Sequence, residues 1–217
     1  MKPLPRIIVF LLAATSIACL LGEMYHLWPM RSFTLCIFLP ACVVLAALAI
    51  HDRQRGDGKL YQFVCIGAVA GLIAAVAYDI FRLPFVFSKS WGLAGFVPAL
   101  PLFKVFPMFG AMILGEDSKG TLAAHLVGWL YHFSNGATFG VMYAAMVNGQ
   151  WRRLWPVAVV FAVGLELAML FTPYPATFGI RVTQTFVIVT LTAHLIFGVT
   201  MGRAGIRLGK WMEVPAP

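Results

Sequence analysis

Charged side chains are scarce in this sequence. They make up 11% of its 217 residues, against 61% for hydrophobic side chains, and the mean hydropathy is +0.87. A soluble domain of ordinary composition is about half apolar and about a quarter charged, so the balance here excludes such a domain. Long apolar runs separated by short charged loops, without the alternation of barrel strands, predict an all-α fold: a polytopic transmembrane helical bundle.

Cysteine pairs and zinc-site histidine pairs are also missing. The chain has four cysteines, which all lie inside apolar runs without forming a Cys-x2-Cys pair: Cys19, Cys36, Cys42 and Cys65. We therefore predict neither a disulfide framework nor a zinc ribbon, and interpret these cysteines as small hydrophobic residues. The zinc motifs His-x3-His and His-Glu-x2-His do not occur either.

Acidic residues are half as numerous as basic ones. Eight Asp and Glu residues stand against sixteen Lys and Arg residues, which gives a formal net charge of +8. Such a charge can attract nucleic acid, but the basic residues lie in short loops and tails, where they act as topology signals. We expect no nucleic-acid partner and expect membrane lipids to surround the chain.

Six apolar runs are predicted to cross the bilayer. They cover residues 7–22, 33–50, 61–80, 122–146, 155–171 and 182–201. The first run follows Lys2 and Arg6 and lacks an obvious Ala-x-Ala cleavage site, so we interpret it as an uncleaved signal-anchor. With a cytoplasmic amino terminus, ten of the sixteen Lys and Arg residues fall on the cytoplasmic side. Both termini are therefore predicted to lie there.

The segment 84–119 between the third and fourth runs is apolar but rich in proline. It contains Pro84, Pro98, Pro101 and Pro107. Its most helix-like part, residues 105–115, is too short to cross a bilayer. We predict a Pro-rich interfacial or re-entrant insert, within a single integral membrane domain that covers residues 1–217.

One pattern, a histidine followed by two glycines, recurs in two of the runs. His-x3-Gly-x3-Gly is found at His132, Gly136 and Gly140, and again at His194, Gly198 and Gly202. Glycines four residues apart let membrane helices approach closely. Together with a shorter match between Gly71 and Gly164, the pattern predicts two related hairpins, 61–146 and 155–202, with the insert in the first.

Ionisable and amide side chains interrupt several runs, where they are costly unless they face protein, water or a ligand. His125 and His132 are seven residues apart and share a helix face, with Asn135 close to the same stripe. We predict that these side chains line one cavity open to the periplasm: Asp79, Arg82, His125, His132, Asn135, Glu166 and His194. In the alternative interpretation each has a private partner, Asp79 with Arg82 and His132 with His194.

Three functions are compatible with such a cavity. The first is a metal-dependent enzyme acting on a lipid or lipid-linked substrate, with His125, His132 and His194 as zinc or iron ligands and Glu166 or Asp79 as the catalytic base. The second is a small transporter or proton-coupled carrier, in which Glu166 and the histidines titrate in turn. The third is a non-catalytic membrane assembly subunit. Haem or a quinone between His132 and His194 is a further interpretation, and haem fits poorly if the two glycine faces pack together.

The stretch His132-x3-Gly136-x2-Phe139-Gly140-x2-Tyr143 resembles a segment in small bacterial inner-membrane proteins of the YagU type, in which His, small residues, Phe and Tyr fall at the same spacing. The likeness covers about the last two fifths of the chain. It implies a multi-span fold in the bacterial inner membrane, and it implies nothing about substrate or chemistry.

Overall fold

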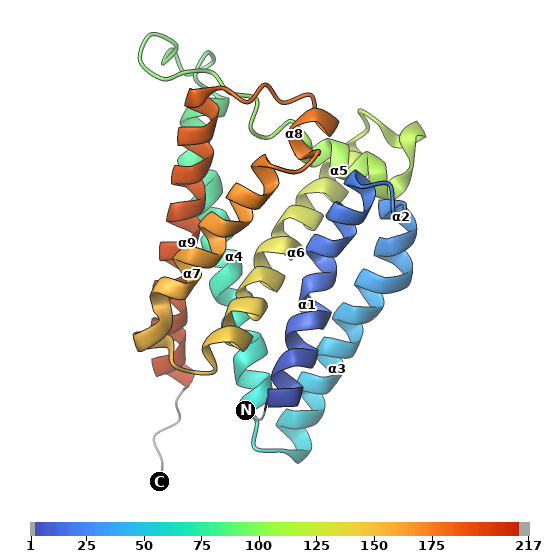
Figure 1. Ribbon diagram of the computed structural model, residues 1–217, viewed down its shortest axis with the longest axis vertical. Helices are drawn as coiled ribbons and strands as arrows, with labels where there is room; N and C mark the ends of the chain where they lie inside the picture. Colours follow the sequence, from blue (N-terminus) through green and yellow to red (C-terminus); the bar gives the residue numbers. More distant parts are fainter. Residues whose placement is uncertain (1–2, 213–217) are drawn as a thin grey trace.

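The structure, a computed structural model, describes residues 3–212, and every regular element in this range is helical. Long helical segments run alternately up and down beside one another (Figure 1). They are α1 (Pro3–Met24), a segment made of α2 (Met30–Phe33), the π-helix η1 (Thr34–Phe38) and α3 (Leu39–Arg55), then α4 (Lys59–Val86), α6 (Leu122–Val147), α7 (Trp151–Leu170) and α9 (Gln184–Met212).

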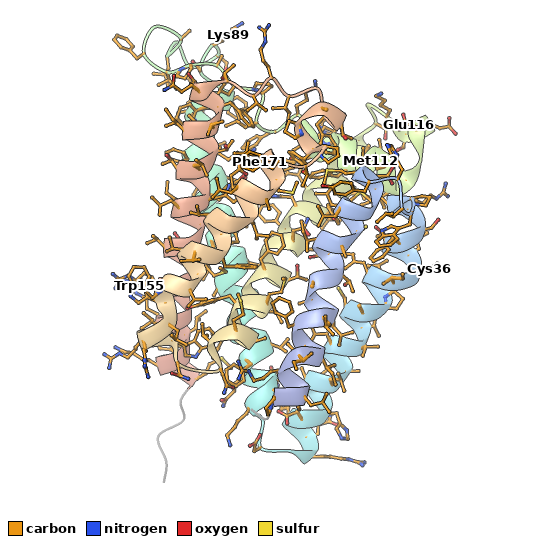
Figure 2. All side chains as sticks on the ribbon, in the orientation of Figure 1. Cys36, Lys89, Met112, Glu116, Trp155 and Phe171 are labelled. Atoms are coloured by element: carbon orange, nitrogen blue, oxygen red, sulfur yellow. The ribbon has the colours of Figure 1, made fainter. Side chains whose placement is uncertain are left out.

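The bundle has two distinct ends (Figure 1). α1 begins and α9 ends at the one that we call the lower end. The short helices α5 (Val105–Leu114) and α8 (Tyr174–Thr177) lie at the other, the upper end. Side chains fill the spaces between the ribbons, with Lys89 and Glu116 near the upper end (Figure 2).

Five helical segments are long and apolar enough to cross a membrane, which makes the chain a polytopic membrane protein. They are Pro3–Met24, Met30–Arg55, Lys59–Val86, Trp151–Leu170 and Gln184–Met212. The remaining predicted run corresponds to α6, which has 26 residues but is not among the five. α6 is the central helix, in contact with α1, α4, α5 and α7. Because it is central it carries polar residues such as His132 and Asn135, which lower its hydropathy.

The Pro-rich insert forms a short helix packed closely on α6. α4 continues through Pro84, and α5 and the 3-10 helix η2 (Glu116–Ser118) follow the loop after it. A Cβ atom at Gly110 would lie 1.8 Å from the carbonyl oxygen of Ala124, and one at Gly128 would lie 1.7 Å from that of Phe106. α5 therefore covers the upper part of α6 and holds Phe106 in the interior.

Glycines hold each of two helix pairs together. In the pair α4–α6, a Cβ atom at Gly71 would lie 2.0 Å from the carbonyl oxygen of Gly136, and one at Gly140 would lie 1.9 Å from that of Gly67. In the pair α7–α9, a Cβ atom at Gly198 would lie 2.8 Å from the carbonyl oxygen of Ala158. The close packing predicted from His-x3-Gly-x3-Gly is present in both pairs.

The packing also aligns the two helix pairs, in a register that differs from the predicted one. Gly71 of α4 lies opposite Gly136 of α6, and Ala158 of α7 lies opposite Gly198 of α9, so Gly71 and Ala158 occupy matching places in the two pairs. Eight residues further along, Asp79 of α4 then matches Glu166 of α7. The predicted match pairs Gly71 with Gly164 instead, and a Cβ atom at Gly164 would meet nothing within 4 Å.

α1 is attached to α6 by polar contacts. The Tyr131 hydroxyl donates to the carbonyl oxygen of Ser16 at 2.7 Å, and the hydroxyls of Ser16 and Thr138 are 2.7 Å apart. Nearer the lower end, Arg6 Nε donates to the carbonyl oxygen of Ala145 at 3.0 Å. α1 is therefore packed as an integral part of the bundle.

Candidate functional site

A cavity of about 130 Å³ lies inside the bundle and has room for several water molecules. We call it the inner chamber. Most of its wall is aromatic or aliphatic. Five of the seven predicted site residues line it, and they come from four helices: Arg82, His132, Asn135, Glu166 and His194.

A second cavity of about 290 Å³, which we call the outer vestibule, continues toward the upper end. Residues 100–102 of the insert and parts of the segment 170–190 form its wall. Arg181 lines it and is exposed, so the vestibule reaches the surface. Six residues line both cavities and mark their junction: Tyr78, Arg82, Val105, Glu166, Met169 and Tyr174.

Toward the lower end the helices are too close together to leave a passage. Gly136 lines the inner chamber, and its carbonyl oxygen lies against Gly71. One turn lower, Gly140 lies against Gly67, and neither position has space for a methyl group. The cavity therefore reaches from the upper end to the middle of the bundle and stops there.

Asp79 is the centre of a closed polar network. Its Oδ2 atom lies 2.9 Å from His132 Nε2, and its Oδ1 atom accepts a hydrogen bond from Arg82 Nη1 at 3.3 Å. Arg82 Nη2 donates to the carbonyl oxygen of Leu102 in the insert. The Arg82 guanidinium also stacks on the ring of Tyr78, 4.6 Å from its centroid. Both carboxylate oxygens of Asp79 are thus occupied.

Glu166 forms a looser pair with His194. Its Oε2 atom is 3.3 Å from His194 Nδ1, which also lies 3.0 Å from the carbonyl oxygen of Thr190. A carbonyl oxygen only accepts, so Nδ1 carries the proton and donates to Thr190. Glu166 therefore receives at most a share of one N–H group, although only 9% of its side chain is exposed.

Tyr78 lies between the two pairs. Its ring centroid is 4.9 Å from that of His194 and 6.1 Å from that of His132. Sequence reasoning missed this residue, although its position directly before Asp79 in an apolar run is a usable signal. It also missed Tyr174 and Phe106, whose place on the wall depends on how α5 and α8 fold back.

Two of the predicted site residues lie elsewhere. His125 is exposed on the surface of α6, so it is outside the cavity. Asp79 lies behind His132 and Arg82 and is not part of the wall. Within residues 3–212, no three His, Cys, Asp or Glu side chains come together in a group that could hold a metal ion. The predicted ligands His125, His132 and His194 are therefore not brought together, and metal binding by them has no support among these residues.

The predicted contact between His132 and His194 also needs correction. His132 and His194 contact Asp79 and Glu166, each on the other helix of its own pair, and not each other. The glycine faces of α6 and α9 likewise pack on α4 and α7. Haem is disfavoured for a different reason from the predicted one, because Tyr78 occupies the space between the imidazoles.

Fold and site together define a polytopic helical membrane protein with an ionisable cavity in its interior. The chain matches no protein-family model, no curated protein and no solved structure.

Proposed function

We propose that this protein is a small proton-coupled carrier of the bacterial inner membrane. One observation supports it above others: two carboxylate–imidazole pairs, Asp79–His132 and Glu166–His194, flank one cavity that reaches mid-bundle from a single end. Ionisable side chains within a membrane mark proton relays and solute pathways. A site at half depth, between two helix pairs, is the arrangement on which alternating access operates.

The two pairs are suited to taking up and releasing protons. Imidazole is the side chain that changes charge between about pH 5 and 8, and each imidazole here has a carboxylate beside it that can share a proton with it. Glu166 and His194 line the inner chamber, where solute and proton meet. Binding of a solute in the chamber then changes the charge balance that holds a proton there, which is the basis of coupling.

The metal-dependent enzyme has less support. A catalytic zinc site uses three protein ligands, and the described residues offer no such group. Asp79 is also poorly placed as a base, since His132 and Arg82 occupy both of its oxygens. Among the described residues, no specific contact supports a lipid substrate or a role as an assembly subunit.

We further propose that α6 crosses the bilayer together with the five apolar segments, giving six spans with both termini in the cytoplasm. Three observations support this topology: α6 has 26 residues, the long segments alternate in direction, and ten of the sixteen Lys and Arg residues fall on the side of the lower end. α5 then lies in the outer half of the membrane as a re-entrant element. The resemblance to YagU-type proteins accords with this arrangement, as does a duplication of the pairs α4–α6 and α7–α9.

The topology predicts opposite labelling of two loops. In a cysteine-free background, Asp117→Cys between α5 and α6 should react with a membrane-impermeant maleimide in intact cells, because it lies at the upper end. Asp57→Cys, exposed between α3 and α4, should react only after the membrane is opened. Gel-shift labelling measures both. Equal reactivity of the two positions in intact cells would contradict the six-span arrangement.

Transport can be tested before the natural solute is known. We expect purified protein in liposomes loaded with a pH-sensitive dye to move protons when at least one of choline, benzoate, alanine and glucose is added outside, and the dye to report this as a change of internal pH. Glu166→Gln should reduce this solute-driven proton flux at least tenfold, since the substitution removes a titratable group from the chamber. The control Glu116→Gln changes an exposed carboxylate at the upper end and should leave the proton flux unchanged. Folded wild-type protein that moves no protons with any solute would overturn the carrier.

A further inference from the structure

The carboxylate of Glu166 is the least compensated charge at the cavity. Within the described residues it accepts no full hydrogen bond, and its ion-pair contact is with His194 Nδ1 at 3.3 Å. The proton on that nitrogen is directed to the carbonyl oxygen of Thr190, as argued above. A buried carboxylate without a firm partner is unfavourable. The chamber wall at Glu166 therefore favours either a proton on the carboxylate or a bound cation beside it.

Arg82, the opposite charge at the same junction, is held by protein atoms. Its two Nη atoms each donate one hydrogen bond, to Asp79 and to the carbonyl oxygen of Leu102. Its Nε atom is buried and has no hydrogen-bond partner among the described residues. Aromatic rings lie over the guanidinium, with the Phe103 centroid 5.0 Å away. Arg82 thus neutralises Asp79, while an ionised Glu166 gives the junction one net negative charge when the histidines are neutral.

The rest of the inner chamber suits an organic cation better than a hydrated metal ion. Beside Glu166 the wall is largely aromatic, with contributions from five elements: Tyr78, Phe106, Phe139, Tyr174 and Phe197. Aromatic faces attract cations, and quaternary ammonium groups are the ligands that such cages recognise. Few polar atoms are present to replace the water shell that Na⁺ or Mg²⁺ would lose.

From this combination we propose that the inner chamber binds a small organic monocation, a quaternary or protonated amine, in competition with a proton at the Glu166–His194 pair. The inference rests on the proposed carrier and adds the class of solute. A proton on the pair cancels the charge that holds the amine, so the two exchange for each other. The carrier is then an antiporter of protons and organic cations.

Other ionisable groups near Glu166 affect this competition less. Tyrosines stay neutral below about pH 10, Arg82 and Asp79 pair with each other, and His132 contacts Asp79 through Nε2. The exposed Arg181 opposes entry of a cation, but salt screens a charge in water. The titratable and charged groups that line the chamber with Glu166 are Tyr78 and Arg82 on α4, His132 on α6, Tyr174 on α8 and His194 on α9, and Asp79 lies behind Arg82 and His132.

Equilibrium binding to the purified full-length protein in detergent tests the proposal without transport. With radiolabelled benzyltrimethylammonium as the probe, we expect saturable binding at pH 8. Once the pH is low enough for the pair to hold its proton, the dissociation constant should rise about tenfold for each unit by which the pH falls, as one-for-one exchange requires. Unlabelled choline should displace the probe, while Na⁺ at equal concentration and benzoate should not. Glu166→Gln should weaken binding at least tenfold. Glu166→Asp, which keeps the charge, should retain the pH dependence, and Glu116→Gln should match wild type.

Each contrary result has a definite meaning. Binding that does not depend on pH, or that Glu166→Gln leaves intact, would show that the cation binds elsewhere and overturn the proposal. Displacement by benzoate would overturn it in favour of an anion site, and equal displacement by Na⁺ would overturn the role of the aromatic wall. If Glu166→Gln does not fold, the wild-type pH profile and the choline and Na⁺ competitions decide. Failure here with a proton flux driven by another solute removes only the solute class, whereas binding without any solute-driven proton flux removes the carrier.

Discussion

Replacing Gly71 with valine is expected to abolish accumulation of the folded protein, and even Gly71→Ala should lower its thermal unfolding midpoint sharply. A Cβ atom at this position would lie 2.0 Å from the carbonyl oxygen of Gly136 and 3.0 Å from the amide nitrogen of Gly140. Both are backbone atoms, so no side-chain rotation relieves the clash and α4 must move away from α6. Overpacking of this kind costs about 3 kcal/mol or more, a large part of a total stability of about 5–15 kcal/mol.

Gly164 on α7 provides the matched control. It is also a glycine inside a long apolar helix, but a Cβ atom there would meet nothing within 4 Å. Gly164→Ala should be neutral or stabilising by about 0.5–1 kcal/mol, because alanine is the better helix former. Size-exclusion profiles of fluorescent fusions and thermal unfolding in detergent measure both variants. A Gly71→Ala protein as stable as Gly164→Ala would refute the close contact between α4 and α6.

The sequence predicted the helical segments well because composition and charge determine them. Each apolar run lies within or close to a long helix, and the basic residues mark the ends. α6 is the instructive exception: the run 122–146 was predicted to cross the bilayer, but α6 is not among the five segments that are long and apolar enough to do so, because its polar residues lower its hydropathy. Helix ends such as Val86 and Met212 were missed, because continuation of a helix past an apolar run depends on packing.

Close packing at the glycines was predictable, but the packing partners were not. His-x3-Gly-x3-Gly indicates that one face of a helix carries small residues and can be approached closely, but it does not say which helix packs on that face. The covering helices are α4 for Gly136 and α7 for Gly198, although residues 87–121, which include α5 and η2, separate α4 from α6 in the sequence. The predicted match of Gly71 with Gly164 rested on identical letters, and of the two glycines only Gly71 lies close to another helix.

The site shows where periodicity stops being informative. His125 and His132 share a face of α6, yet His132 is covered by Asp79 and Phe106 and His125 is exposed. A helical stripe says which residues point in one direction, but it does not say how far along the helix the neighbours extend. Glu166 lines the inner chamber, and the sequence singles it out because a carboxylate deep in an apolar run is costly and therefore rare.

Asp79→Asn should destabilise the protein by about 3–5 kcal/mol, the usual cost of removing one partner of a buried ion pair. The side chains of Asp79 and Arg82 are only 11% and 6% exposed. Without the carboxylate, the Arg82 guanidinium would stay charged and buried among Tyr78, Phe103 and Phe106 with only neutral acceptors, the Leu102 carbonyl and the amide oxygen at position 79. Urea unfolding in mixed micelles, followed by tryptophan fluorescence, measures the loss.

A double variant separates the charge from the shape of these side chains. Asp79→Asn with Arg82→Met removes both charges, so it should be more stable than Asp79→Asn alone by about 2 kcal/mol or more, because no buried charge then lacks a partner. Glu166→Gln should behave in the opposite way. Its carboxylate has no full hydrogen bond to lose, so the neutral amide should unfold at the same or a higher urea concentration while cation binding is lost. Equal destabilisation by Asp79→Asn and Glu166→Gln would mean that both pairs contribute equally to folding stability. The charge of Glu166 would then already be compensated within the protein, and no ligand would be needed to compensate it.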